Sequence, residues 1–216
     1  ITYAMFILEH PALDPDWENT ARHIIEWVHE ELGNKQYLKY GVVVTDEQTA
    51  YRVPGNSHSS REASVELMYW AASGDTTWLR NAIRQLNWAT YMVDMDGKNF
   101  YPTNDIWMTD GYGDYVRHYL RAMAAAPQLA PDNADHLLST SSIVKNIVYR
   151  PTEIKYSVFD SASKEVFRLK DKPGSIRVNG KSLEQTETIA PQGWTWQLLE
   201  KGGILTVSHT GGGEIL

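Results

Sequence analysis

The segment 56–92 reads NSHSSREASVELMYWAASGDTTWLRNAIRQLNWATYM, and it decides the fold expected for the first half of the chain. Residues 59–73 carry apolar side chains on more than one face, which predicts a largely buried helix. Gly74 can end that helix and Asp75 can cap the next one. Apolar residues then recur on one face from Leu79 to Val93. The stretch therefore predicts two antiparallel helices joined as an αα-hairpin.

The same helical period extends to both sides of this hairpin. Residues 17–32 place apolar side chains on one face, and Gly33 follows as a stop signal. A further helix is expected from about Asp114 to Ala126, ending at Pro127. Two long segments, 34–57 and 94–113, connect the helices, and loops of that length in a compact domain are usually functional.

After residue 130 the pattern changes to short strands. Runs of β-branched and aromatic residues predict strands at 142–149, 153–159, 165–169, 175–178, 194–199 and 204–209. Asn179-Gly180 is typical of a type I′ hairpin turn, and Trp194 and Trp196 are interpreted as core residues. We therefore expect an α+β protein, with helical hairpins in residues 1–130 and a small antiparallel β-sandwich in residues 131–216.

Composition excludes several classes of function. The 216 residues carry a net charge of −7 and no run of Lys or Arg, which argues against nucleic-acid binding. No apolar run approaches the length of a membrane span. The absence of cysteine excludes disulfides, thiolate catalysis and Cys-ligated zinc, but it decides no compartment. A periplasmic or secreted location is slightly favoured over a cytoplasmic one. The 8 Trp and 12 Tyr suit either core packing or the stacking surfaces of a sugar-binding cleft.

Acidic side chains gather just before two of the predicted helices. Asp46 and Glu47 precede NSHSSRE, in which a capping box of Ser59 and Glu62 is the structural interpretation. That interpretation leaves His58 and Arg61 unexplained.

The segment 104–118, NDIWMTDGYGDYVRH, is the second such place. Asp110 or Asp114 can cap the following helix, where an acid is favoured by about 0.3–1 kcal/mol. Only one acid is needed for that role, and the flanking aromatic residues stay unexplained. An acid cluster beneath aromatic rings can separate the pKa values of two carboxyl groups.

The segments 56–92 and 105–131 resemble parts of the (α/α)-toroid, or six-hairpin, carbohydrate-active proteins of bacteria. In these a SHxxR hairpin and a DGYGDYxRH helix precede a C-terminal β-domain. The resemblance implies that this chain is the C-terminal part of a toroid, with its first residue in the middle of a longer protein. Further hairpins of the same protein, or of a partner chain, would then complete the ring.

The leading hypothesis is a glycoside hydrolase acting on a poly- or oligosaccharide, since glycosidic hydrolysis uses two carboxyl groups. The candidate catalytic residues are Asp110, Glu47 and Asp114, and the candidate substrate-binding residues are His58, Arg61, Tyr101, Trp107, Tyr112 and His118. The chain lacks a Gly-rich phosphate loop, a G-x-S-x-G elbow and an H-E-x-x-H motif, and no cofactor or metal ion is expected.

Two alternatives stay open. A polysaccharide lyase would abstract a proton beside a uronate carboxylate, and Tyr112, His58, Asn56 and Arg61 are the residue types that such chemistry uses. A non-catalytic glycan-binding or scaffold module would bind sugar without turnover.

Overall fold

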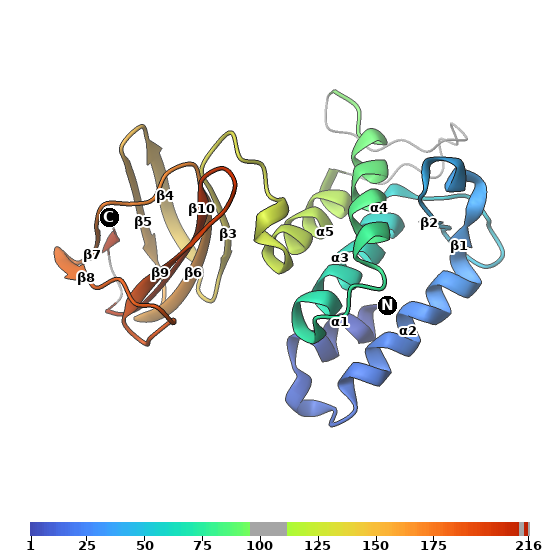
Figure 1. The fold of residues 1–216 in the computed structure, drawn as a ribbon, viewed down its shortest axis with the longest axis horizontal. Helices are drawn as coiled ribbons and strands as arrows, with labels where there is room; N and C mark the ends of the chain where they lie inside the picture. The colour runs from blue at the N-terminus through green and yellow to red at the C-terminus, as the bar shows by residue number, and fades with distance from the viewer. Residues whose placement is uncertain (96–111, 212–213, 216) are drawn as a thin grey trace. The chain divides into compact units, whose positions relative to one another are not determined.

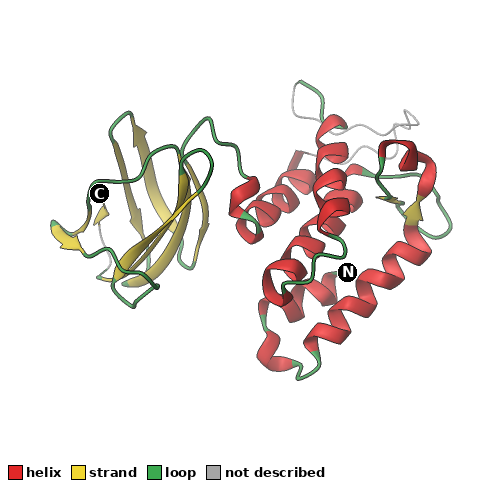
Figure 2. Cartoon of the chain, in the orientation of Figure 1, coloured by secondary structure: helices red, strands yellow, loops and turns green. Residues whose placement is uncertain are grey.

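The computed structural model describes residues 1–95, 112–211 and 214–215, and the side chains of 112–114 and 214–215 lie outside that description. The chain divides into two compact units, Ile1–Ala126 and Pro127–Leu216. The first unit is mainly helical and the second is mainly built of strands (Figure 2). The predicted α+β class is confirmed.

The helical unit contains a short antiparallel strand pair among its helices (Figure 1). Its elements are α1 (Thr2–Glu9), η1 (Pro11–Leu13), α2 (Trp17–Leu32), β1 (Gly33–Asn34), η2 (Lys35–Tyr40), β2 (Val44–Thr45), α3 (Asn56–Ser73), α4 (Leu79–Tyr91) and α5 (Tyr112–Ala125). The amphipathic pattern of 17–32 holds, because α2 buries Ala21, Ile25 and Val28 and ends before Gly33.

Helix α3 lies at the centre of this unit and contacts α1, α2, α4 and α5. Its apolar residues Val65, Leu67 and Tyr69 are buried, as its sequence predicts. The helix ends at Gly74, whose φ of 78° is the left-handed conformation that glycine adopts without a steric penalty. Seven polar or charged side chains of α3 are buried as well, so this helix places many polar groups in the interior of the helical unit.

The toroid that the resemblance implies is wrong for this chain. A toroid is a ring of helical hairpins, whereas here α1, α2, α4 and α5 pack around one central helix and the β1–β2 pair lies in the same unit. The physical reason is the burial of α3 on several faces, which needs neighbours all around it. The α3–α4 hairpin itself is present, but a hairpin is a local motif that many helical folds share.

Three expected N-cap residues are also wrong. The first is Asp75, because α4 begins at Leu79 after Trp78 and no side chain caps it. Helix α3 begins at Asn56, after Gly55, and no side chain caps it. Ser59 and Glu62 therefore lie inside the helix and do not form a capping box. Similarly, α5 begins at Tyr112, so that Asp114 belongs to its first turn and is not the N-cap. Asp110 lies outside the described residues.

The strand unit contains a four-stranded and a five-stranded antiparallel sheet, ordered β3-β6-β10-β9 and β4-β5-β11-β7-β8. The strands are β3 (His136–Thr140), β4 (Val144–Arg150), β5 (Glu153–Val158), β6 (Ala162–Leu169), β7 (Ile176–Val178), β8 (Lys181–Leu183), β9 (Gly193–Leu198), β10 (Gly203–Thr210) and β11 (Glu214–Ile215), with η4 (Pro127–Leu129) before them. Asn179 and Gly180 join β7 to β8 with φ values of 49° and 78°, as a type I′ turn requires.

One hydrophobic cluster contains residues of both sheets, among them Tyr156 and Val178 from one sheet and Phe167 and Trp194 from the other. The interpretation of Trp194 as a core residue is confirmed, and Trp196 packs against the same cluster. Strands β3 and β8 were not predicted, because five and three residues give too short a pattern to recognise.

Candidate functional site

The structure describes four of the predicted site residues in full. Tyr101, Trp107 and Asp110 lie outside the described residues, and Tyr112 and Asp114 are placed only as the first and third residues of α5. The described four are Glu47, His58, Arg61 and His118.

Glu47 and His58 form an ion pair between the loop after β2 and the first turn of α3. Glu47 Oε1 lies 3.1 Å from His58 Nδ1. The Glu47 side chain is 8% exposed and that of His58 is 28% exposed, so a substrate can reach the imidazole more easily than the carboxylate. Since the carboxylate binds at Nδ1, Nε2 is the ring nitrogen that can act on a substrate. A carboxylate behind an imidazole is the arrangement that orients a histidine for general base catalysis.

Arg61 and His118 meet where α3 packs against α5. Arg61 Nε donates to His118 Nε2 at 3.2 Å, and Arg121 Nη1 lies 2.9 Å from His118 Nδ1. Burial, followed by the positive charges of Arg61, Arg121 and Arg117, lowers the pKa of His118 to about 3. His118 is therefore neutral near pH 7 and helps to hold the arginines in place, rather than supplying a proton.

The two pairs belong to one region. His58 and Arg61 lie on α3, which packs against α5, the helix that carries His118. Asn56 begins the same turn of α3 and is fully buried. Neither its amide nitrogen nor its amide oxygen has a hydrogen-bond partner among the described residues. Leaving a buried amide unpaired costs about 1–3 kcal/mol.

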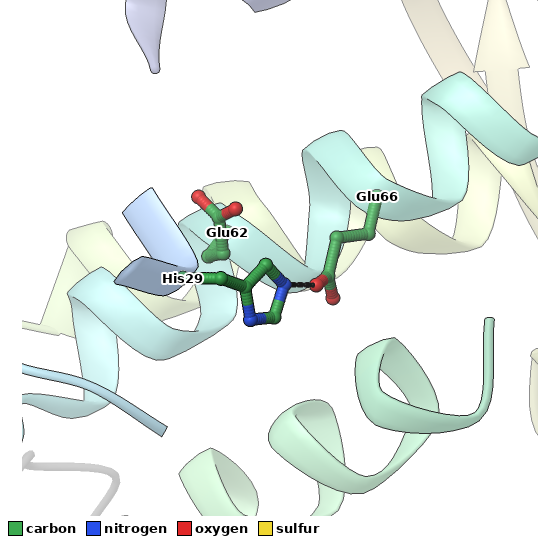
Figure 3. A group of neighbouring side chains, drawn as sticks. All are labelled: His29, Glu62 and Glu66. Atoms are coloured by element: carbon green, nitrogen blue, oxygen red, sulfur yellow. Dashed lines mark hydrogen bonds and ion pairs between the residues drawn. The ribbon is translucent and has the colours of Figure 1, made fainter. Parts of the chain in front are cut away.

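A second polar cluster lies deeper in the helical unit and was missed by the sequence analysis. His29 of α2 faces Glu62 and Glu66 of α3, and one ligand atom from each of the three lies within 4.8 Å of the others (Figure 3). His29 Nε2 lies 2.5 Å from Glu66 Oε1. The signal that could have found it is the Glu-x-x-x-Glu spacing, which puts both carboxylates on one face of a helix.

The two glutamates of this cluster have different environments. Glu66 Oε2 accepts from Gln85 Nε2 at 3.2 Å, and Gln85 Oε1 accepts from Thr45 Oγ1 at 3.1 Å. Glu62 Oε1, in contrast, has no hydrogen-bond partner in the described part of the chain. Burial and the negative charge of Glu66 raise the pKa of Glu62 well above 4.5. Burial also raises the pKa of Glu66, although the hydrogen bond and charge of His29 oppose this.

The raised pKa of Glu62 predicts a loss of stability as pH rises. Between its ordinary pKa of 4.5 and its folded pKa, the folded chain binds one proton more than the unfolded chain at this site. The free energy of unfolding should therefore fall by about 1.4 kcal/mol per pH unit from this group over that interval. In Glu62→Gln, urea unfolding measured at a series of pH values above 4.5 should show a fall with pH that is smaller by that amount over the same interval.

Glu30→Gln provides the matched control for this measurement, since Glu30 lies exposed on α2. It should keep the slope of the wild type. Equal slopes in Glu62→Gln and the wild type would show that Glu62 does not bind its proton more tightly in the folded chain.

The strand unit contains a Ser–His–Glu group that lacks the geometry of a catalytic triad. Ser163 Oγ and Glu165 Oε2 lie 3.0 Å and 3.2 Å from the same ring nitrogen, His209 Nε2. A triad needs the nucleophile and the carboxylate on opposite ring nitrogens. All three residues are buried, so the group stabilises the unit and does not reach a substrate.

The same unit also has an open cavity of about 770 Å³. It is lined by core residues such as Tyr156 and Phe167 and by charged residues such as Arg150, Glu153 and Lys172. Among these, Arg150 and Glu153 form an ion pair at 2.9 Å. The cavity contains no group of nucleophile, base and acid that would suit catalysis.

Comparison with known proteins gives no family assignment. No protein-family model matches the chain, and a search of curated proteins finds no significant match. Within the described residues, no helix is both long and apolar enough to cross a membrane.

Proposed function

We propose that the helical unit belongs to a carbohydrate-active enzyme whose site contains Glu47, His58 and Arg61. The observation that carries this proposal is the Glu47–His58 pair at 3.1 Å, on the same turn of α3 as Arg61 and Asn56. A carboxylate, an imidazole, a guanidinium and an unpaired amide are the groups that bind sugar hydroxyls and carboxylates. The aromatic residues of the chain add surfaces suited to stacking on sugar rings.

Hydrolysis by paired carboxylates is the first chemistry that fits this site. Glu47 would act as the base or nucleophile, since a carboxylate bonded to a histidine is poorly placed to donate a proton. Asp110 would then supply the proton to the leaving oxygen, with Asp114 as the second candidate. Such a pair is separated by about 5–5.5 Å in a retaining enzyme and by about 6.5–9.5 Å in an inverting one.

Elimination is the second chemistry, and two observations favour it specifically. The orientation of His58 by Glu47 suits a base that removes the proton beside a uronate carboxylate. The electrons of that C–H bond would form a C=C bond as the glycosidic C–O bond breaks. The guanidinium of Arg61, which lies three residues after His58 on α3, is of the type that binds the substrate carboxylate.

For the strand unit we propose an antiparallel β-sandwich that has a structural role. This is supported by the single hydrophobic cluster that contains residues of both sheets. The burial of Ser163, Glu165 and His209 supports the same role.

The experiment that tests the function compares the products of the full chain on neutral and on uronate-containing polysaccharides. New reducing ends without ultraviolet absorbance identify a hydrolase, and reducing ends with the absorbance of an unsaturated uronate identify a lyase. Saturable glycan binding without either product identifies a binding module and overturns the enzymatic proposal. Absence of both binding and turnover across the panel overturns the carbohydrate proposal altogether.

A further inference from the structure

We propose that His29, Glu62 and Glu66 bind one divalent transition-metal ion, and that Zn²⁺ fits the site best. The cluster lies between α2 and α3 and shares no residue with the proposed sugar site (Figure 3). This inference therefore does not depend on the proposed function.

The distances suit a small ion. Zn²⁺ binds His nitrogen and carboxylate oxygen at about 2.0–2.2 Å, which places tetrahedral ligand atoms about 3.3 Å apart. Here the ligand atoms of the three residues lie within 4.8 Å of one another. The closest pair, His29 Nε2 and Glu66 Oε1, is 2.5 Å apart. To bind one tetrahedral ion, these two atoms would have to move apart by about 0.8 Å. Rotation of two side chains achieves this without a change in the helices.

The charges of the cluster favour a cation. Glu62 and Glu66 each have a carboxylate oxygen within 4.8 Å of the other, and both residues are almost completely buried. Glu62 Oε1 has no partner in the part of the chain that the structure describes. A divalent ion would neutralise both carboxylates with His29 uncharged, and would provide the missing partner of Glu62.

The surroundings of Glu66 resemble the outer shell of a metal site. Gln85 Nε2 donates a hydrogen bond to Glu66 Oε2, and Thr45 Oγ1 donates one to Gln85 Oε1. Glu66 Oε1 is thereby directed towards His29 and the space beside Glu62. Outer hydrogen bonds of this kind orient ligands and raise metal affinity. The side chain of His29 is 22% exposed, which gives an ion a path from solvent and leaves room for a water ligand.

The ligand set selects the class of ion. Imidazole nitrogen and carboxylate oxygen are both ligand atoms that Zn²⁺ binds, and three protein ligands leave the fourth tetrahedral position for water. Ca²⁺ and Mg²⁺ prefer six or more oxygen ligands, including water, and gain little from an imidazole nitrogen. Mn²⁺ and Fe²⁺ accept the same ligands as Zn²⁺ but bind more weakly to a given site.

The test is calorimetric titration of the chelator-treated full chain with Zn²⁺ alone, followed by Co²⁺ as a spectroscopic probe. We expect one ion per chain and a visible absorption band of bound Co²⁺. Loss of a group that only orients a ligand lowers metal affinity by about 10–100-fold. Glu62 and His29 are themselves ligands, so Glu62→Gln and His29→Ala should each weaken Zn²⁺ binding by about 100-fold or more.

Two variants of exposed residues on α2 serve as controls, His23→Ala and Glu30→Gln, and both should bind Zn²⁺ as the wild type does. Circular dichroism of every variant shows whether it is folded. If Glu62→Gln does not fold, the affinity of His29→Ala for Zn²⁺ decides the test. His29 is partly exposed, so its truncation should destabilise the fold less than a change at the buried Glu62. Absence of saturable binding to the wild type, or wild-type affinity in His29→Ala, would overturn the metal site. None of these readouts involves turnover of a sugar, so failure here leaves the proposed function untouched.

Discussion

Replacement of Glu47 by glutamine should lower turnover by about 10²–10⁴-fold while leaving the fold intact. In hydrolysis the variant loses a reacting carboxylate, and in elimination it loses the group that orients His58. Both chemistries therefore predict a large effect on kcat. The measurement is the initial rate on the best substrate of the polysaccharide panel, with circular dichroism as the check of folding.

His58→Ala distinguishes the two chemistries. When His58 is the base, His58→Ala should lower kcat at least as much as Glu47→Gln does. When Glu47 is the reacting carboxylate, His58→Ala should lower kcat less than Glu47→Gln does. Glu30→Gln makes the same chemical substitution at an exposed position of α2 and should stay fully active. Full activity of Glu47→Gln would remove Glu47 from the site under either chemistry.

Most helices and strands could be predicted because their signals are local. The amphipathic face of 17–32, the helix stop at Gly74 and the Asn-Gly turn each depend on neighbouring residues, and the structure has all three. The arrangement of the helices could not be predicted in this way. The sequence shows that α3 is buried, but not which helices bury it, and the resemblance to a toroid supplied the wrong neighbours.

The interior polar residues show the limit of a sequence reading most clearly. Glu62 follows Ser59 by three residues, the spacing of a capping box, which gave a sufficient local explanation for it. Only the start of α3 at Asn56 shows that this glutamate lies inside a buried helix. His29, which lies beside Glu62 and Glu66, precedes Glu66 by 37 residues in the sequence. The three side chains therefore come together only because α2 packs against α3.

Glu47, His58, Arg61 and His118 became candidates because helix capping explains none of them. The structure pairs Glu47 with His58 and Arg61 with His118, while their role in a sugar site stays a prediction. It also gives His118 contacts that the sequence did not predict. With a pKa near 3 it cannot bind a sugar as a cation, and its contacts are with Arg61 and Arg121.

The second large effect is expected in the strand unit, where Glu165→Ala should lower the free energy of unfolding by about 3–5 kcal/mol. Glu165 is fully buried, and its carboxylate accepts from Tyr156 Oη at 3.0 Å and lies 3.2 Å from His209 Nε2. Removing the carboxylate leaves a phenol and an imidazole buried without their partner. Urea unfolding of the full chain, followed by hydrogen exchange in peptides from β6 and β10, measures the loss in this unit alone.

The pH dependence of the same experiment separates this group from an ordinary core residue. Burial raises the pKa of Glu165, but the hydrogen bonds from His209, Ser163 and Tyr156 outweigh it, so the net pKa lies below 4.5. Its contribution is therefore present above pH 4.5 and lost as pH falls through the folded pKa. The difference between wild type and Glu165→Ala should shrink on acidification, whereas the exposed control Glu187→Ala should stay within about 0.5 kcal/mol of the wild type throughout. A difference that stays constant down to low pH would mean that the volume of the side chain, and not its charge, stabilises the unit.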